Sequence, residues 1–90
     1  MWLEDNRLMG LDIVELVLAV EKKFGISIPD EEASELYTPR KLTDYVMSKA
    51  NDRGLTRDEV AAIVRQVIEE ETGTYDFHED SHFVNDMNLD

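Results

Sequence analysis

Residues 56–72 carry the pattern that most restricts the fold of this chain. Thr56 and Glu59 stand at the two ends of a Thr-x-x-Glu capping box, in which each side chain accepts a hydrogen bond from the other residue's backbone N–H. An apolar stripe at helical spacing follows, and Gly73 stands where a helix C-cap is expected. These signals predict an amphipathic helix over 56–72, whose apolar side must be covered by other helices.

Earlier segments of the chain supply such helices. The pattern predicts a helix over 11–24, in which Leu11, Val14, Val17 and Leu18 form one stripe. Asp30 can cap a short helix over 31–36, and Thr38 followed by Pro39 is a strong start signal for a helix over 39–50. No segment is typical of a strand. We therefore predict an all-α fold, a small helical bundle.

Length and composition limit the domain organisation. A chain of 90 residues has room for one modest core, so we expect an N-terminal tail over 1–10 and a single helical domain over 11–90. There is no cysteine, which excludes disulfides and thiolate metal ligands. No apolar run is long enough to cross a membrane and no signal-peptide pattern is present, so we expect a cytoplasmic protein without a membrane partner.

The formal net charge of −12 restricts the partners of this chain. Binding to nucleic acid depends on Lys and Arg placed against phosphates, so we predict no nucleic-acid partner. An acidic protein is steered toward basic surfaces, which favours a basic-surfaced protein partner. The alternative is that the acidity only keeps the protein soluble.

The stretch from Leu11 to Ala33, LDIVELVLAVEKKFGISIPDEEA, resembles the second helix and following loop of acyl carrier proteins. In that family a serine stands just before the Leu-Asp pair and carries the phosphopantetheine arm. Here that position is Gly10, which has no hydroxyl. The resemblance therefore implies a carrier-like module that lacks its attachment site, with no 4'-phosphopantetheine cofactor and no catalytic residue.

The remainder of the resemblance occurs in a different order. Residues 55–73 resemble the first helix of the family, and residues 75–90, which end in FVNDMNLD, resemble the loop that precedes the serine. Placing Asp90 before Gly10 restores the order of the family. The resemblance thus implies an acyl-carrier-protein-like helical bundle in circularly permuted order, joined through the connector at 51–54. Chain ends often lie close together in compact domains, which makes permutation physically easy.

A second account of the loop remains open. Trp2-Leu3-Glu4-Asp5 also resembles the Phe-Val-Glu-Asp piece of the family and stands at a suitable distance before Gly10. Trp2 would then fill the loop's anchor site, and Phe83 would complete a partner chain by domain swapping. The sequence leaves open a monomer or a domain-swapped dimer, and we favour the version in which Phe83 packs within its own chain.

Helix two of the family docks enzymes with basic surfaces, and acidic residues stand at matching positions here. Apolar residues also widen this helix beyond what one buried face requires, which predicts a partner contact. We predict a partner-binding surface made of Asp12, Ile13, Glu15, Leu16, Val20 and Glu21. Lys22 and Lys23 depart from the acidity of the family at this point. The alternative is that the charges only form the solvent-facing side of an amphipathic helix.

The leading hypothesis is a non-catalytic binding module, not an enzyme, that acts as an accessory partner of enzymes of fatty acid or polyketide-type metabolism. A rival hypothesis is a functional carrier that is modified at another residue, such as Ser34 or Ser81, or is completed by domain swapping. Ser81 follows Asp80 as in the Asp-Ser pair of the family, but we predict that Ser81 acts as a local cap in its loop.

A weaker alternative is a zinc hydrolase. Residues His78 to His82 spell His-Glu-x-x-His, which binds zinc when both histidines lie on one face of a helix. Gly73 and Thr74 stand just before this motif, and Asp80 and Ser81 lie inside it, so a stable helix is not expected. We predict no metal site, with His78 and His82 as weak candidate ligands.

Overall fold

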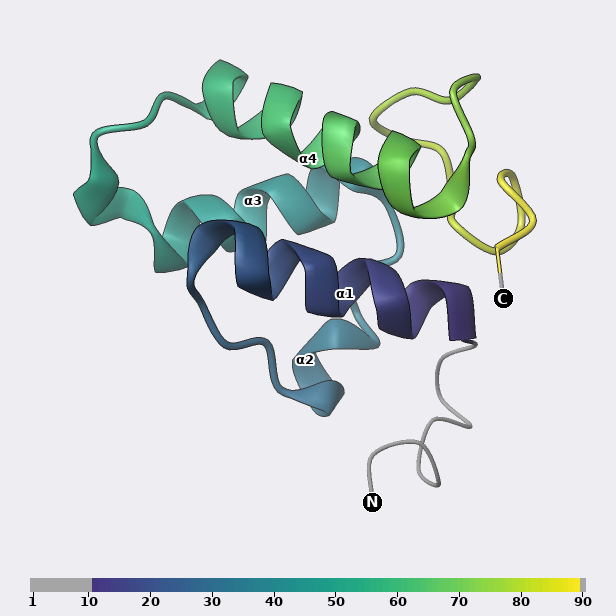
Figure 1. Ribbon diagram of the computed structural model, residues 1–90, viewed down its shortest axis with the longest axis horizontal. Coiled ribbons are helices and arrows are strands. Elements are labelled where there is room, and N and C mark those ends of the chain that lie inside the picture. Colours follow the sequence, from purple (N-terminus) through teal and green to yellow (C-terminus); the bar gives the residue numbers. More distant parts are fainter. Residues whose placement is uncertain (1–10, 90) are drawn as a thin grey trace.

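The computed structural model describes residues 11–89, so the tail expected over 1–10 lies outside the described residues. Within this range the structure is entirely helical, without strands, which confirms the all-α prediction (Figure 1). Its elements are α1 (Leu11–Phe24), α2 (Asp30–Ala33), α3 (Pro39–Lys49), the 3-10 turn η3 (Asn51–Arg53) and α4 (Arg57–Thr72). No helix of the described range is both long and apolar enough to span a membrane.

Side-chain caps fix the starts of α3 and α4. The Lys41 N–H donates to the Thr38 hydroxyl oxygen at 3.1 Å, and Pro39 is the first residue of α3. At α4 both bonds of the capping box form, from the Thr56 N–H to Glu59 Oε1 at 2.8 Å and from the Glu59 N–H to Thr56 Oγ1 at 3.2 Å. These caps satisfy backbone donors that the first helical turn leaves without partners.

The second helix is shorter than the sequence pattern predicts. α2 ends at Ala33, whereas the pattern predicts a helix over 31–36. The chain continues as a turn, in which the Leu36 N–H donates to the Ala33 carbonyl at 3.0 Å. Thr38 must be extended because it precedes a proline, and its φ of −136° and ψ of 156° are extended values. The helix therefore has to unwind before it reaches Thr38.

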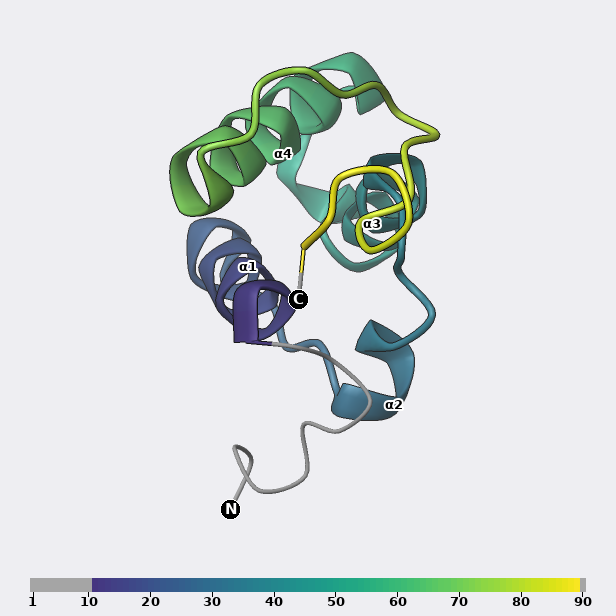
Figure 2. The ribbon, with the colours of Figure 1, turned by 90° about the vertical axis from the view of Figure 1, so that its right-hand side faces the viewer.

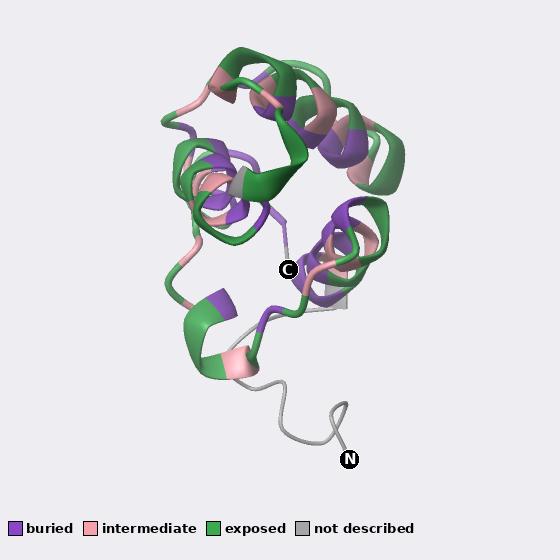
Figure 3. Ribbon diagram, turned by 90° about the vertical axis from the view of Figure 1, so that its left-hand side faces the viewer, coloured by how far each residue is buried: buried purple, intermediate pink, exposed green. Residues whose placement is uncertain are grey.

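The longer helices enclose the core. In Figure 1, α4 lies across α1 and α3 and runs in the opposite direction to both. Figure 3 shows that the buried residues of these helices face the middle of the molecule. The most deeply buried apolar side chains come from all three helices and from the C-terminal loop: Val14, Leu16, Val20, Leu42, Val46, Val60, Val64, Ile68 and Phe83.

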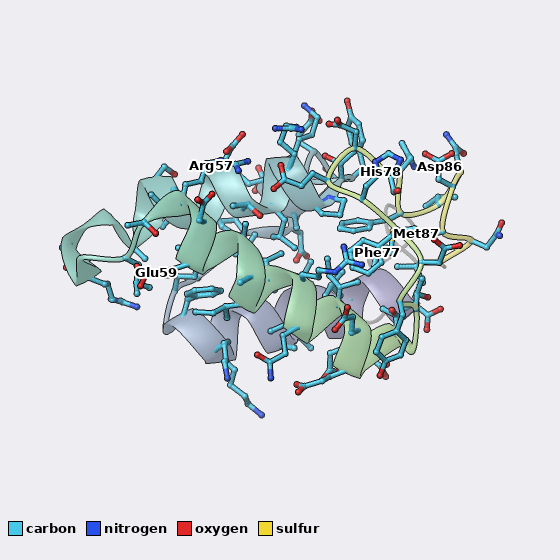
Figure 4. All side chains as sticks on the ribbon, turned by 90° about the horizontal axis from the view of Figure 1, so that it is seen from above. Arg57, Glu59, Phe77, His78, Asp86 and Met87 are labelled. Atoms are coloured by element: carbon cyan, nitrogen blue, oxygen red, sulfur yellow. The ribbon has the colours of Figure 1, made fainter. Side chains whose placement is uncertain are left out.

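The loop after α4 closes one end of the bundle (Figure 2). Arg65 ties this loop to α4, because its guanidinium donates to the carbonyls of Phe77 and Tyr75 at 2.9 and 2.8 Å. The same guanidinium lies 4.1 Å from the centroid of the Phe77 ring. Figure 4 shows Phe77 and Met87 on the inner side of the loop, with His78 and Asp86 toward its outer edge.

Candidate functional site

The end of the C-terminal loop lies beside the start of α1. Gly10 is outside the described residues, but α1 begins directly after it, at Leu11. Figures 1 and 2 both show the end of the C-terminal loop near this first turn. Leu89 is only 6% exposed and belongs to the same apolar cluster as Ile13. The two ends of the described range therefore meet at one end of the bundle.

Local hydrogen bonds shape the last turn of the loop. The Nδ1 atom of His82 accepts from the backbone N–H groups of Val84 and Asn85, at 3.2 and 3.1 Å. The His82 N–H in turn donates to Asp86 Oδ2 at 2.7 Å. This reciprocal pattern resembles the capping of a helix start, and it holds residues 82–86 in one compact turn.

The same turn delivers apolar side chains to the core. The Leu89 N–H donates to the Phe83 carbonyl at 2.8 Å, which closes the turn, and Asn88 adopts the left-handed conformation with φ of 58°. The Phe83 N–H donates to the Tyr37 carbonyl at 2.9 Å, so the loop is also fixed to the segment before α3. Phe83, Met87 and Leu89 are all buried as a result.

The apolar residues of the predicted partner-binding surface lie inside the bundle and not on its surface. Ile13 is 7% exposed, and Leu16 and Val20 are fully buried within this chain. Their burial has a simple reason: α1 packs against α4 on one side and against apolar residues of the 26–33 segment and the C-terminal loop on others. The wide apolar stripe is therefore used inside the bundle.

The acidic residues of the predicted surface occupy different environments. Glu15 is exposed, whereas Asp12 and Glu21 are partly buried. Glu21 Oε2 accepts a hydrogen bond from the Ile28 N–H at 2.6 Å, so this carboxylate fixes the loop between α1 and α2. Leu18 is a large apolar residue of α1 that is 45% exposed, although the stripe predicts it in the core.

An open groove runs between α1 and α4 beside these residues. It has a volume of about 650 Å³. Its lining combines apolar and charged residues of both helices: Glu15, Leu18, Ala19, Lys22, Lys23, Val67, Glu70 and Glu71. Glu15 belongs to the predicted surface, but Val67, Glu70 and Glu71 of α4 do not, because the pairing of α1 with α4 cannot be read from either helix alone.

The His-Glu-x-x-His motif lies in turns outside the helices. His78 Nδ1 accepts from the Asp80 N–H at 3.3 Å, and Glu79 bridges Arg40 at 3.1 Å and Arg57 at 3.4 Å. Across residues 11–89 no group of three His, Cys, Asp or Glu side chains is arranged to hold a metal ion. The motif thus attaches the loop to α3 and α4 and provides neither the helical face nor the free glutamate that zinc proteolysis requires.

The hydroxyl groups of the two candidate serines form local hydrogen bonds. Ser81 is 5% exposed and its Oγ accepts from the His78 N–H at 3.0 Å, which agrees with the prediction of a local cap. Ser34 Oγ donates to the Glu31 carbonyl at 2.9 Å, in the turn that ends α2. Neither serine lies at the start of α1.

Asp80 and Arg40 form a two-pronged ion pair that gives the loop a pH dependence. Arg40 donates to the two carboxylate oxygens of Asp80 at 2.7 and 3.1 Å, and these hydrogen bonds hold the pKa of Asp80 below its ordinary value of 3.8. A depressed pKa in the folded state means that the pair stabilises the fold above about pH 4 and that this contribution disappears as the pH falls through the folded value.

We expect Asp80→Asn to flatten the acid limb of the stability profile. Between about pH 5 and pH 2 the melting temperature of the variant should fall less steeply than that of the wild type. The effect should be small, since both side chains are substantially exposed. Asp76→Asn, an exposed acid in the same loop, is the matched control. Identical slopes for the wild type and Asp80→Asn would contradict the assignment.

Comparison with known proteins identifies relatives of this chain. It is 46% identical over 46 residues to an acyl carrier protein of Thermosynechococcus vestitus, 47% over 45 residues to one of Helicobacter hepaticus and 46% over 48 residues to one of Buchnera aphidicola. These matches cover 51%, 50% and 53% of this chain, and 57%, 59% and 61% of the respective relatives, so the chain spans less than two thirds of their length.

No family model matches the chain, and no solved structure matches it. The sequence identity to several curated proteins of one name nevertheless agrees with the helical bundle and with the resemblance of Leu11 to Ala33. Through about half of its residues, this chain is related to the acyl carrier protein family, and its fold is a small helical bundle of that type.

Proposed function

We propose that this chain is a non-catalytic, acyl-carrier-protein-like binding module that works without a phosphopantetheine arm. The observation that carries the proposal is the glycine at residue 10, where the resemblance to acyl carrier proteins implies the attachment serine. A phosphodiester to the arm requires a side-chain oxygen, and glycine has no side chain. The residues of this chain therefore do not fit the prosthetic group at that position.

We also infer that the module is circularly permuted. The arrangement of its two ends supports this inference, because the C-terminal loop ends near the first turn of α1 and its residue Leu89 is buried. The connector would then be a newer joint between α3 and α4, and it is well structured. Arg53 of η3 donates to the Phe24 carbonyl at the end of α1, and Gly54 turns the chain with φ of 72°.

The proposed partner is a basic surface of an enzyme of acyl metabolism. Acyl carrier proteins interact with such enzymes in general, and the acidity of this chain favours basic partners. The exposed carboxylates of Glu31 and Glu32 on α2, outside the α1–α4 groove, are available for such contacts. Ile13, Leu16 and Val20 are buried and contribute nothing to this contact.

Intact-mass measurement tests the absence of the arm. We expect the wild-type chain, incubated with a phosphopantetheinyl transferase and coenzyme A, to keep its original mass, because Gly10 offers no nucleophile. An acyl carrier protein with its serine, treated in the same tube, is the positive control for the transferase. A mass increase of one arm on this chain would overturn the proposal and favour a carrier modified at another residue.

Such a result would direct attention to Ser34 and Ser81. Both hydroxyls already form short-range hydrogen bonds, and neither stands at a long helix's start, where backbone N–H groups favour phosphate. Peptide mapping of the modified chain would identify the residue. The hydrolase alternative receives no support from the turns that hold His78 and His82.

A further inference from the structure

The groove between α1 and α4 separates charges of opposite sign. Because the two helices run in opposite directions, Glu70 and Glu71 in the last turn of α4 lie toward the start of α1, on the side of Glu15 (Figure 1). Lys22 and Lys23 occupy the last turn of α1. Glu15 and Lys22 are separated by about 11 Å along the helix axis, at 1.5 Å per residue.

An exposed apolar residue lies between the two charged ends. Leu18 is 45% exposed and lines the groove together with Ala19 and Val67. The face therefore has an acidic end, an apolar centre and a basic end.

Within the described part of the chain, these charged side chains make few contacts with oppositely charged groups. Among residues 11–89, Glu15, Glu71, Lys22 and Lys23 take part in no ion pair, and Glu70 accepts only a hydrogen bond from Gln66 at 3.2 Å. The glutamates at the end of α4 also lie at the negative end of the helix dipole, where acidic residues are unfavourable. Neither feature is explained by the stability of the isolated bundle.

We propose that this face binds a second copy of the same chain about a twofold axis that passes near Leu18. When this axis lies in the plane of the face and perpendicular to α1, the twofold rotation places the acidic end of one copy over the basic end of the other, and the reverse contact forms at the same time. Lys22 and Lys23 then meet Glu15, Glu70 and Glu71 of the second copy, and Leu18 packs against its own counterpart.

Charge complementarity favours a second copy over a uniformly basic occupant of this groove. A uniformly basic surface would be attracted to Glu15, Glu70 and Glu71 but repelled by Lys22 and Lys23. The net charge of −12 opposes self-association, but the repulsion between distant charges is screened at physiological ionic strength. Exposed ion pairs are individually weak, so we expect a dissociation constant on the order of 100 µM.

Sedimentation equilibrium with paired charge variants tests the proposal. Wild-type chain in about 0.15 M salt should show concentration-dependent dimerisation. Lys22→Glu with Lys23→Glu should weaken the dimer at least tenfold, and Glu70→Lys with Glu71→Lys should do the same. An equimolar mixture of these two double variants should recover a dimer, because each repulsive face now matches the other. Light scattering or a fluorescent label on one variant would detect that heterodimer.

A matched control separates the local contact from net charge. Lys41→Glu with Lys49→Glu makes the same change in net charge on exposed positions of α3, so its dimer should weaken far less than that of the Lys22/Lys23 variant. All substituted side chains are exposed, and circular dichroism would verify that each variant folds.

Several outcomes would overturn the proposal. These are a wild type that stays monomeric at millimolar concentration, a mixture that does not recover the dimer, an equal loss in the Lys41/Lys49 control, and a dimer that persists in both charge variants, as a domain-swapped dimer would. None of them bears on the missing attachment site, so the proposed function would stand or fall separately by intact mass.

Discussion

Phe83→Ala is expected to destabilise the folded chain by about 3–5 kcal/mol. The side chain is 2% exposed and belongs to the main apolar cluster, so its removal leaves a cavity between the loop and the helices. The folded state of a domain of this size is stable by only about 5–10 kcal/mol, so much of that stability should be lost. Urea unfolding followed by circular dichroism would measure the change.

Val84→Ala is the matched control for this experiment. Val84 is the next residue in the same turn but is 50% exposed, so we expect a change within about 0.5 kcal/mol. The comparison also separates the two accounts of the loop. A near-neutral Phe83→Ala would mean that Trp2 fills the anchor site, and a loss that depends on protein concentration would mean that Phe83 packs into a partner chain.

Local sequence signals predicted the helices because those signals act over a few residues. The Thr56–Glu59 capping box and the Thr38-Pro39 start both appear in the structure with their expected hydrogen bonds. The predictions were wrong where the burial of a side chain depends on how the helices pack against one another. Helical spacing places Leu18 in the core stripe, yet it is exposed, because the direction from which α4 covers α1 selects the buried side.

The candidate site was less accessible to sequence reasoning, since its contacts join distant parts of the chain. Glu21 was predicted to face a partner, but it accepts a hydrogen bond from the Ile28 N–H after the chain has turned at Gly25. Glu79 was a possible catalytic base in a zinc motif, and it instead bridges Arg40 and Arg57 from two different helices. Such partners become visible only when the helices are assembled.

Gly10→Ser is expected to convert an inert chain into a substrate for phosphopantetheinyl transferase. The substitution returns a hydroxyl to the position just before α1, where the backbone N–H groups of the first helical turn favour a phosphate. We expect a mass increase of one arm on most molecules, against none on the wild type. Pro29→Ser, which adds a hydroxyl at the exposed N-cap of α2, where the backbone has ordinary extended values, is the control and should stay unmodified.

The same substitution tests the permuted order when it is made in two chain orders. In a reordered variant, residues 55–90 are followed directly by residues 10–50, so that Asp90 precedes the new serine as in the family. If the C-terminal loop already lies in its family position beside α1, covalent continuity adds little, and both orders should be modified to a similar extent. Modification of the reordered variant alone would show that the loop must be joined to the serine to be recognised. Inertness of both, with folding verified, would show that the helix start no longer has the geometry of a carrier, and the permutation would then lose its main functional argument.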